Sequence, residues 1–157
     1  MEWFVRAFVK ASVAWLALGA TLGVAMAAYP AWTVYRPAHA HMNLLGFVTM
    51  MIYGVAFHVI PRFTGNPLHD RRVAGAQWWV TNAGLALMVI GFVLRATRGV
   101  PVSLATIVLA TGGTLSALGA WAFAWNIWRT IEAKSVARAA SVEATPLARA
   151  RTVAMRG

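Results

Sequence analysis

The chain has 157 residues, of which 60% are hydrophobic and only 11% are charged. A soluble domain carries about 25% charged residues, so this composition excludes an ordinary water-soluble fold and indicates a protein whose apolar surface faces lipid. The formal net charge is +10, but the basic residues gather outside the apolar runs, as loop charges do in membrane proteins, and nucleic acid is not expected as a partner. There is no cysteine, which excludes disulfides, cysteine-held iron–sulfur clusters and covalently attached haem.

Four apolar runs are each long enough to cross the hydrocarbon core of a bilayer, which takes roughly 20 residues. They cover about residues 8–28, 38–60, 74–96 and 102–128. The links between them are short, which predicts antiparallel neighbours. We therefore predict an all-α integral membrane protein, with a four-helix up-down bundle over residues 1–132 and a basic tail over residues 133–157.

The positions of lysine and arginine predict the orientation of this bundle. Eleven of them lie on the side of the two termini and of the link after the second run, and three lie on the other side. Because an excess of these residues marks the cytoplasmic side, both termini are expected in the cytoplasm of a bacterial cell, with the chain spanning the inner membrane. The first run also resembles a signal peptide, with Ala25-Met26-Ala27 as a cleavage site, but it is longer than a usual signal core and we expect a retained helix.

Small residues recur at helical spacing in two of the runs. Gly19 and Gly23 form one such stripe, and Gly112, Ser116 and Ala120 form another. Stripes of this kind let membrane helices approach closely. They predict helix contacts, either within the chain or between chains.

The second run opens with the residues best suited to carry chemistry. His39 and His41 stand near its periplasmic end, and histidines inside hydrocarbon are costly and usually functional. On a regular helix two residues this far apart point about 200° away from each other. They therefore cannot bind one iron together, but each can face a different neighbour, and imidazole is a common axial ligand of haem iron. The alternative is that one or both are packing residues that bind a carbonyl group or water.

Four segments of this run carry a likeness to a known family: His39-Ala40-His41, Leu45-Gly46-Phe47, Tyr53-Gly54 and Val59-Ile60-Pro61-Arg62. Together they resemble the tenth helix of the catalytic subunit of haem–copper oxidases, and especially of C-type cytochrome c oxidases and nitric oxide reductases. That helix holds two haems through an H-x-H pair near the periplasmic side. The resemblance implies that His39 faces a high-spin haem and His41 a low-spin haem.

The chain departs from the family pattern in its small number of histidines. Only His58 and His69 remain of the four. His58 follows His41 by 17 residues (58 − 41), which is about 25 Å along a helix axis, so it cannot reach the same iron. A complete haem–copper centre, and oxidase or reductase activity by this chain alone, are therefore not expected.

The expected cofactor is a non-covalent haem b held by His41. His39 is a further candidate iron ligand, for a different haem. His58 is expected to be a structural or proton-accessible histidine at the cytoplasmic interface, with metal binding at an inner haem or a quinone contact as the alternative. The sixth ligand of the iron would come from a second copy, from a partner subunit or from Met26 near the end of the first run. The iron could also stay five-coordinate and open to gas.

Two kinds of neighbour could support such a haem. Arg36 precedes the histidine pair and could bind haem propionates, as could Arg95 and Arg98 on the same side. Asn43 follows His39 by four residues and shares its face, so it could orient an imidazole.

These features favour a membrane b-type haem protein that transfers electrons or binds nitric oxide or oxygen, as an oligomer or a subunit of a respiratory complex. One alternative is a cofactor-free accessory or assembly subunit of a respiratory or denitrification complex. Another is a copper-binding protein that uses His39 and His41 with Met26 or Met42. The apolar runs hold no acidic residue, which argues against a carboxylate-based proton pathway.

Overall fold

The computed structural model describes residues 1–154, and side chains up to residue 133. The described chain is helical throughout, apart from short connections. Its elements are α1 (Trp3–Ala28), the 3₁₀ helix η1 (Pro30–Tyr35), α2 (Arg36–His41), the π-helix η2 (Met42–Thr49), α3 (Met50–Thr64), α4 (Arg71–Ala96) and α5 (Val102–Ala154).

Four helical segments are long and apolar enough to cross a membrane: Trp3–Ala28, Pro30–Thr64, Arg71–Ala96 and Val102–Ala133. The predicted all-α fold with four membrane helices is confirmed. The second segment, here called the second span, joins η1, α2, η2 and α3 into one continuous crossing. The orientation of the bundle stays a prediction. The tail predicted at residues 133–157 lies almost wholly outside the residues whose side chains are described.

The helix bounds differ from the apolar runs because hydropathy marks what faces lipid and not where a helix begins or ends. α1 starts at Trp3 and α4 at Arg71, several residues before the apolar runs. The link after α1 is itself helical, because Pro30 opens a 3₁₀ turn that leads directly into α2. α3 passes through Pro61 and ends where Gly65 adopts a left-handed backbone conformation, with φ of 65°.

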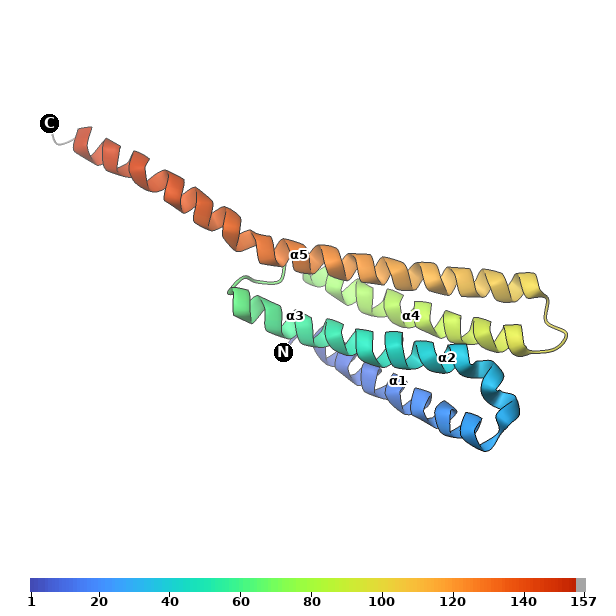
Figure 1. Ribbon diagram of the computed structural model, residues 1–157. Helices are drawn as coiled ribbons and strands as arrows, with labels where there is room; N and C mark the ends of the chain where they lie inside the picture. The colour runs from blue at the N-terminus through green and yellow to red at the C-terminus, as the bar shows by residue number, and fades with distance from the viewer. Residues whose placement is uncertain (155–157) are drawn as a thin grey trace.

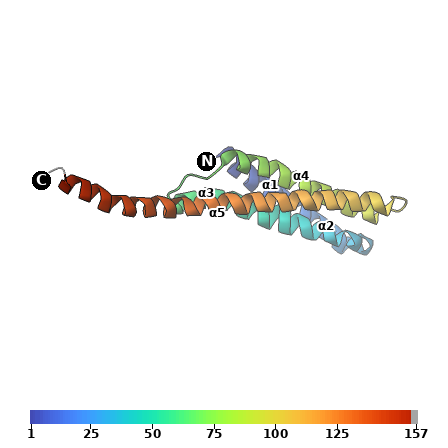
Figure 2. The same cartoon turned by 90° about the horizontal axis from the view of Figure 1, so that it is seen from above.

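The spans run antiparallel, with α1 against the second span and α4 against α5 (Figures 1 and 2). The second span crosses the α4–α5 pair, since α2 and η2 contact α4 whereas α3 contacts α5. We call the end of the bundle with His39 and His41 the histidine end. The opposite end, with the N-terminus and the α3–α4 loop, is the terminal end.

The core of the terminal end is aromatic. Phe4 and Phe8 of α1 are fully buried and meet Tyr53 and Phe57 of α3, with ring centroids 5.7 Å apart in each near-perpendicular pair. Phe123 of α5 packs on Tyr53 at 4.4 Å. Edge-to-face rings add attraction beyond their buried area, so this cluster fixes α1, α3 and α5 to one another.

Buried amide groups hold the α3–α4 loop onto α5. The side chain of Asn126 accepts from the backbone N–H of Asp70 at 3.0 Å and donates to its carbonyl oxygen at 2.7 Å. Asn66 donates to the backbone oxygen of Thr130 at 2.8 Å. The carboxylate of Asp70 in turn caps α4 by accepting from the N–H groups of Arg72 and Val73.

Both stripes of small residues make contacts inside the chain. A Cβ atom added at Gly112 would lie 2.7 Å from the backbone of Gly84 and 2.7 Å from that of Met88, so α4 and α5 pack backbone to backbone. Gly19 and Gly23 of α1 face side chains of the second span. This second contact belongs to the site described next.

Candidate histidine site

His39 lies against α1. Its Nδ1 atom is 2.8 Å from the carbonyl oxygen of Gly19. A carbonyl oxygen only accepts hydrogen bonds, so Nδ1 carries the proton and Nε2 keeps its lone pair. The ring has room because α1 has no side chain at Gly23, where a Cβ atom would lie 2.9 Å from His39 Cε1.

Asn43 packs beside this imidazole, one turn along the second span. Its Nδ2 donates to the backbone oxygen of His39 at 2.8 Å and lies 3.4 Å from His39 Nδ1. Since both of these nitrogens carry protons, the second contact is packing rather than a hydrogen bond. Gly19 leaves the space that this amide fills, because a Cβ atom there would lie 2.6 Å from Nδ2. The structure thus places Asn43 where it can orient the His39 ring.

His41 faces α4 instead. Its Nδ1 lies 2.7 Å from the carbonyl oxygen of Pro37, and its ring centroid lies 4.9 Å from that of Phe92. By the same reasoning the proton is on Nδ1 and the lone pair on Nε2. Neither His39 nor His41 forms a hydrogen bond through Nε2 with any residue that the structure describes.

A π-helix begins directly after the pair, at Met42. The hydroxyl of Thr49 bonds to the carbonyl oxygen of Leu44, five residues earlier, inside this widened turn. π-turns are rare and frequent at functional sites. Sequence reasoning missed this π-helix, because hydrophobic spacing cannot distinguish a widened turn from a regular one over so short a stretch.

A wedge opens beside His41. Among the described residues, α5 contacts the second span through α3 alone, so α2 and η2 stand apart from α5 at the histidine end. A hollow of about 210 Å³ there is lined by Pro37, Phe92 and Arg95, together with Val34 and Ala96. A cavity of about 320 Å³ deeper in the bundle is lined by Leu45, one turn after His41. His41 lines neither volume itself, but Pro37 lines the outer one, with Arg95, and Leu45 lines the deeper one, each one turn from His41.

Two other expected residues lie less close to this arrangement. Arg36 is exposed at the start of α2. Met26 is half-buried near the end of α1, and no described side-chain interaction joins it to His39 or His41. The structure adds Phe92 and the carbonyl group of Gly19, which sequence reasoning could not assign because they act through tertiary contacts. It also adds the carbonyl group of Pro37, one helical turn before His41.

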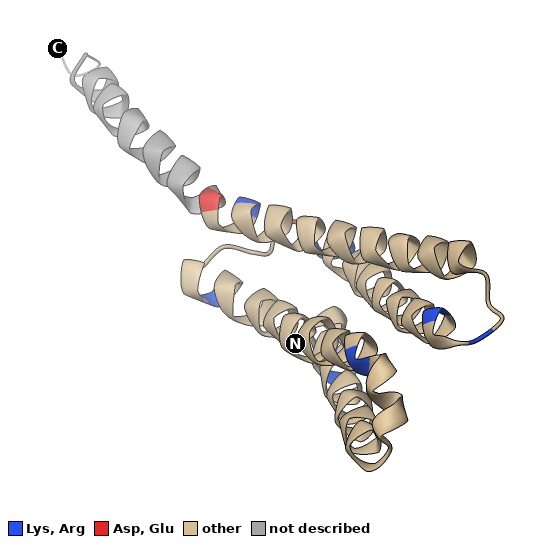
Figure 3. Ribbon diagram, turned by 45° about the vertical axis from the view of Figure 1, so that its right-hand side comes forward, with Lys and Arg blue, Asp and Glu red and all other residues tan. Residues whose placement is uncertain are grey.

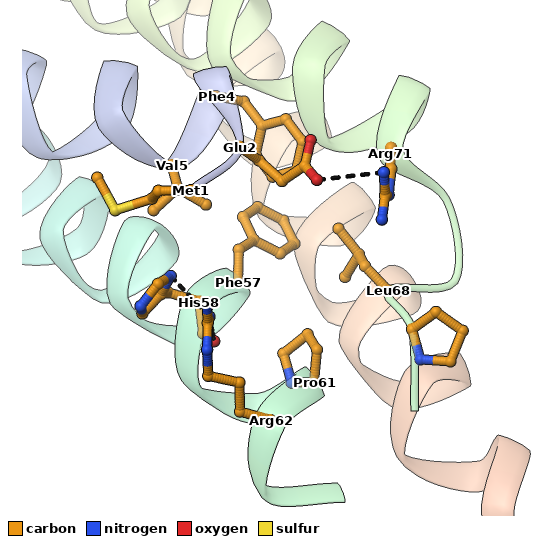
Figure 4. A pocket seen from close by; sticks show the side chains of 11 residues that line it. Met1, Glu2, Phe4, Val5, Phe57, His58, Pro61, Arg62, Leu68 and Arg71 are labelled. Carbon is orange, nitrogen blue, oxygen red and sulfur yellow. Dashed lines mark hydrogen bonds and ion pairs between the residues drawn. The ribbon is translucent and has the colours of Figure 1, made fainter. Parts of the chain in front are cut away.

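His58 lies in a different setting, at the terminal end. Its Nδ1 accepts from Arg62 Nη1 at 2.8 Å, and because arginine only donates, the proton of this ring is on Nε2. The ring borders a cavity of about 310 Å³ that Phe4 and Phe57 also line, beside the ion pair of Glu2 with Arg71 at 3.2 Å (Figure 4). The lone pair that a metal would need is already engaged.

No group of three or more histidine, aspartate or glutamate side chains that could hold a metal ion occurs within the described part of the chain. A metal at His39 or His41 would therefore need ligands from a cofactor or from another chain.

The fold and site together define a four-span, all-helical membrane protein with two imidazoles held on opposite sides of one span, each through Nδ1 by a backbone carbonyl group. The chain belongs to the family of cytochrome c and quinol oxidase polypeptide I, which it matches over residues 4–154. The predicted resemblance to the catalytic subunit of haem–copper oxidases is confirmed at the level of the family.

The individual relatives are named as subunits of cytochrome c oxidases. The chain is 26% identical to the Cbb3-type cytochrome c oxidase subunit CcoN1 of Stutzerimonas stutzeri, over 69% of this chain and 27% of that protein. It is 30% identical to a cytochrome c oxidase subunit 1 of Thermus thermophilus, over 44% of this chain and 13% of that protein. A second Thermus thermophilus sequence of that name is 31% identical over 38% of this chain and 56% of the relative. The chain thus spans less than two thirds of the length of each of these relatives.

Proposed function

We propose that this chain is a membrane b-type haem protein that acts in electron transfer or in binding nitric oxide or oxygen, as a subunit or oligomer. The observation that carries the proposal is the contact of each imidazole, through Nδ1, with a backbone carbonyl oxygen. Histidines that bind metals usually donate their other ring N–H to a carbonyl or carboxylate, which fixes the ring and the free lone pair. His39 and His41 both have this arrangement, at 2.8 and 2.7 Å.

The surroundings of His41 fit a haem better than those of the other histidines. The wedge between η2 and α5 offers an apolar space on that side of the second span. Arg95 lines the outer hollow and would pair with propionates, as would Arg36 at the start of α2. A haem bound there would supply one-electron chemistry, and the chain would hold it through the His41 imidazole and the largely apolar walls of this space.

The second axial ligand is proposed to come from outside this chain. His39 and His41 face α1 and α4 respectively, so they cannot bind the same iron. His58 has its lone pair engaged by Arg62. A second copy or a partner subunit is therefore the favoured source, with Met26 as the candidate from this chain. His39 offers a second axial nitrogen, for another haem.

The test is a reduced-minus-oxidised visible spectrum of protein purified after haem-sufficient expression. We expect a Soret band and α and β bands in the wild type, and their loss in His41→Ala. His69→Ala is the matched control, because His69 is exposed in the α3–α4 loop, and its spectrum should match the wild type. A wild type without a Soret band, or an unchanged spectrum in His41→Ala, would contradict the proposal.

Addition of nitric oxide distinguishes an open iron, whose spectrum shifts, from a six-coordinate iron, whose spectrum does not.

The second candidate is a cofactor-free accessory subunit of a respiratory complex. It is favoured by the short share of the relatives that this chain spans, 27% for the Stutzerimonas protein. Copurification with an intact oxidase, in a preparation whose own chain lacks haem, would support it. Elemental analysis of the same sample distinguishes copper at His39 or His41 from iron.

A further inference from the structure

The cavity of about 310 Å³ at the terminal end has one apolar wall. Phe4 and Val5 of α1 and Phe57 of α3 form its inner part, and all three are buried in the bundle. Pro61 and Leu68 extend this wall towards the α3–α4 loop (Figure 4). The wall can accept hydrocarbon but offers no side-chain hydrogen bond.

Two arginine side chains line the same cavity and remain accessible. Arg62 of α3 is exposed, and the side chain of Arg71 of α4 is 65% exposed. Each guanidinium group carries five N–H donors, and the described residues engage only those on Nη1. Arg62 Nη1 donates to His58, and Arg71 Nη1 pairs with Glu2. The Nε and Nη2 donors of both arginines therefore stay available within the described part of the chain.

The charged groups around the cavity favour an anion. Glu2 is the one acidic side chain among the described residues that line it, against the two arginines. His58 adds no acceptor, because the lone pair of its Nδ1 already accepts from Arg62. A phosphate group suits this set of donors, since arginine binds phosphate oxygens in a bidentate manner.

The two arginines lie at the height of lipid headgroups. Arg62 stands two residues before the end of α3, and Arg71 is the first residue of α4. Trp3 and Trp79 are exposed and line a second hollow that Arg71 also borders. Tryptophan rings prefer the interface between membrane and water. The guanidinium groups are thus placed beside lipid phosphates, with the apolar wall next to them.

We propose that this cavity binds the headgroup of an anionic phospholipid, whether or not the chain binds haem. Arg62 and Arg71 hold the phosphate, and the glycerol end of the lipid lies against the wall of Phe4 and Phe57. A zwitterionic phospholipid carries the same phosphate together with a cation, which the two arginines repel. Free phosphate lacks the apolar part that the wall would bury.

Native mass spectrometry of the detergent-solubilised protein tests the site, because it counts bound lipids directly. The probes are phosphatidylglycerol and phosphatidylcholine with the same acyl chains, and we expect the wild type to bind phosphatidylglycerol more tightly. Arg62→Gln and Arg71→Gln should each weaken its binding by about fivefold and leave phosphatidylcholine unchanged. Arg129→Gln is the control, because this exposed arginine lies at the same end but outside the cavity. It should change the affinity by less than about twofold, since exposed charges are screened over distance.

Glu2→Gln changes the affinity in the opposite direction. It frees the Nη1 donors of Arg71 and removes the one negative charge from the lining. Phosphatidylglycerol should then bind about fivefold more tightly, a gain that damage to the fold would not produce. This variant decides the question even if an arginine variant does not fold, and unchanged or weaker binding in Glu2→Gln overturns the proposal.

Three further outcomes would overturn it. Equal affinities of the wild type for the two lipids would show that the cavity does not select an anion. A loss in Arg129→Gln as large as in Arg62→Gln and Arg71→Gln would assign the binding to diffuse surface charge. Inorganic phosphate that raises the melting temperature as much as phosphatidylglycerol does would assign the site to a free anion instead of a lipid.

Discussion

Three of the four histidines share one span, and their different neighbours give them different chemistry. His39 and His41 each donate from Nδ1 to a backbone carbonyl and keep the lone pair on Nε2. His58 accepts at Nδ1 from Arg62 and keeps its proton on Nε2. The first form suits an axial ligand of iron and the second does not.

Gly23, which packs against the His39 ring, should affect the haem signal as much as the ring itself does. In Gly23→Ala the new Cβ atom would lie 2.9 Å from His39 Cε1, so the ring has to move and its bond to the Gly19 carbonyl is weakened. We expect a haem signal that His39 supports to fall or shift in the visible spectrum. Val24→Ala is the control, because this side chain of α1 is 71% exposed and its truncation adds no atom near the His39 ring. Equal spectra for the two variants would mean that the ring position does not matter.

Asp70 links stability to pH at the start of α4. The N–H group of Val73 lowers the pKa of this carboxyl, with a smaller contribution from the N–H of Arg72 and the charges of His69 and Arg72, against an opposing desolvation. A lowered folded-state pKa means that the stabilisation is present above the unfolded value of about 3.9 and is lost as the pH falls through the folded value. Asp70→Asn should therefore melt below the wild type at neutral pH, and the difference should shrink under acid. Melting curves in detergent across this range measure it, and a constant difference would contradict the cap assignment.

At the scale of helices, close packing and polar anchoring act in different places. α4 and α5 approach backbone to backbone through Gly84 and Gly112. At the terminal end, Asn126 holds the α3–α4 loop onto α5 by two hydrogen bonds to Asp70. α2 and η2 have neither kind of contact with α5, which is why the wedge opens only at the histidine end.

The α4–α5 contact should not tolerate one extra methyl group. A Cβ atom at Gly84 would lie 2.7 Å from the backbone nitrogen of Ser116 and 2.9 Å from the oxygen of Gly112, and backbone atoms cannot rotate away. We expect Gly84→Ala to lower the free energy of unfolding by about 1–3 kcal/mol, measured by thermal or denaturant unfolding in detergent. Gly113→Ala, on the open side of α5, should change it by less than about 0.5 kcal/mol. Equal effects would show that the two helices can separate slightly at no cost.

At the scale of the whole molecule, charge and topology together predict how the bundle sits in the membrane. Lys and Arg residues lie mostly towards the ends of the spans (Figure 3), and few of them lie at the histidine end. Four antiparallel spans place the N-terminus and the α3–α4 loop at one end and the α1–η1 and α4–α5 connections at the other. The excess of positive charge at the first end predicts that it faces the cytoplasm.

Single introduced cysteines test this orientation on a clean background, because the chain has no cysteine. Thr97→Cys, in the α4–α5 connection, should react in intact cells with a maleimide that cannot cross the membrane. Pro67→Cys, in the α3–α4 loop, should react only after the membrane is permeabilised. Both positions are exposed, so accessibility within the protein does not differ. The reverse pattern would invert the bundle and place the histidine pair near the cytoplasm.

Much of the architecture could be predicted from the sequence because hydrophobicity over long runs is a local property. The four spans, the helical class and the family likeness around His39 and His41 all follow from residues adjacent in the chain. Regular helix geometry also predicts that these two histidines face different neighbours. The π-helix at Met42–Thr49 could not be predicted, since it depends on one extra residue in a turn.

The sequence by itself determined that this chain has four membrane-spanning segments and an imidazole pair near one end. A membrane span requires a long apolar segment, and both the length and the apolarity of a segment are local properties of the sequence. Only the tertiary structure decided that the His39 ring meets the carbonyl group of Gly19, that a wedge opens between the second span and α5, and that Thr81 and Tyr53 share a cavity. Those outcomes depend on atoms brought together from segments far apart in the sequence. The carbonyl of Gly19, for example, meets a ring 20 residues later, and no local pattern records that contact.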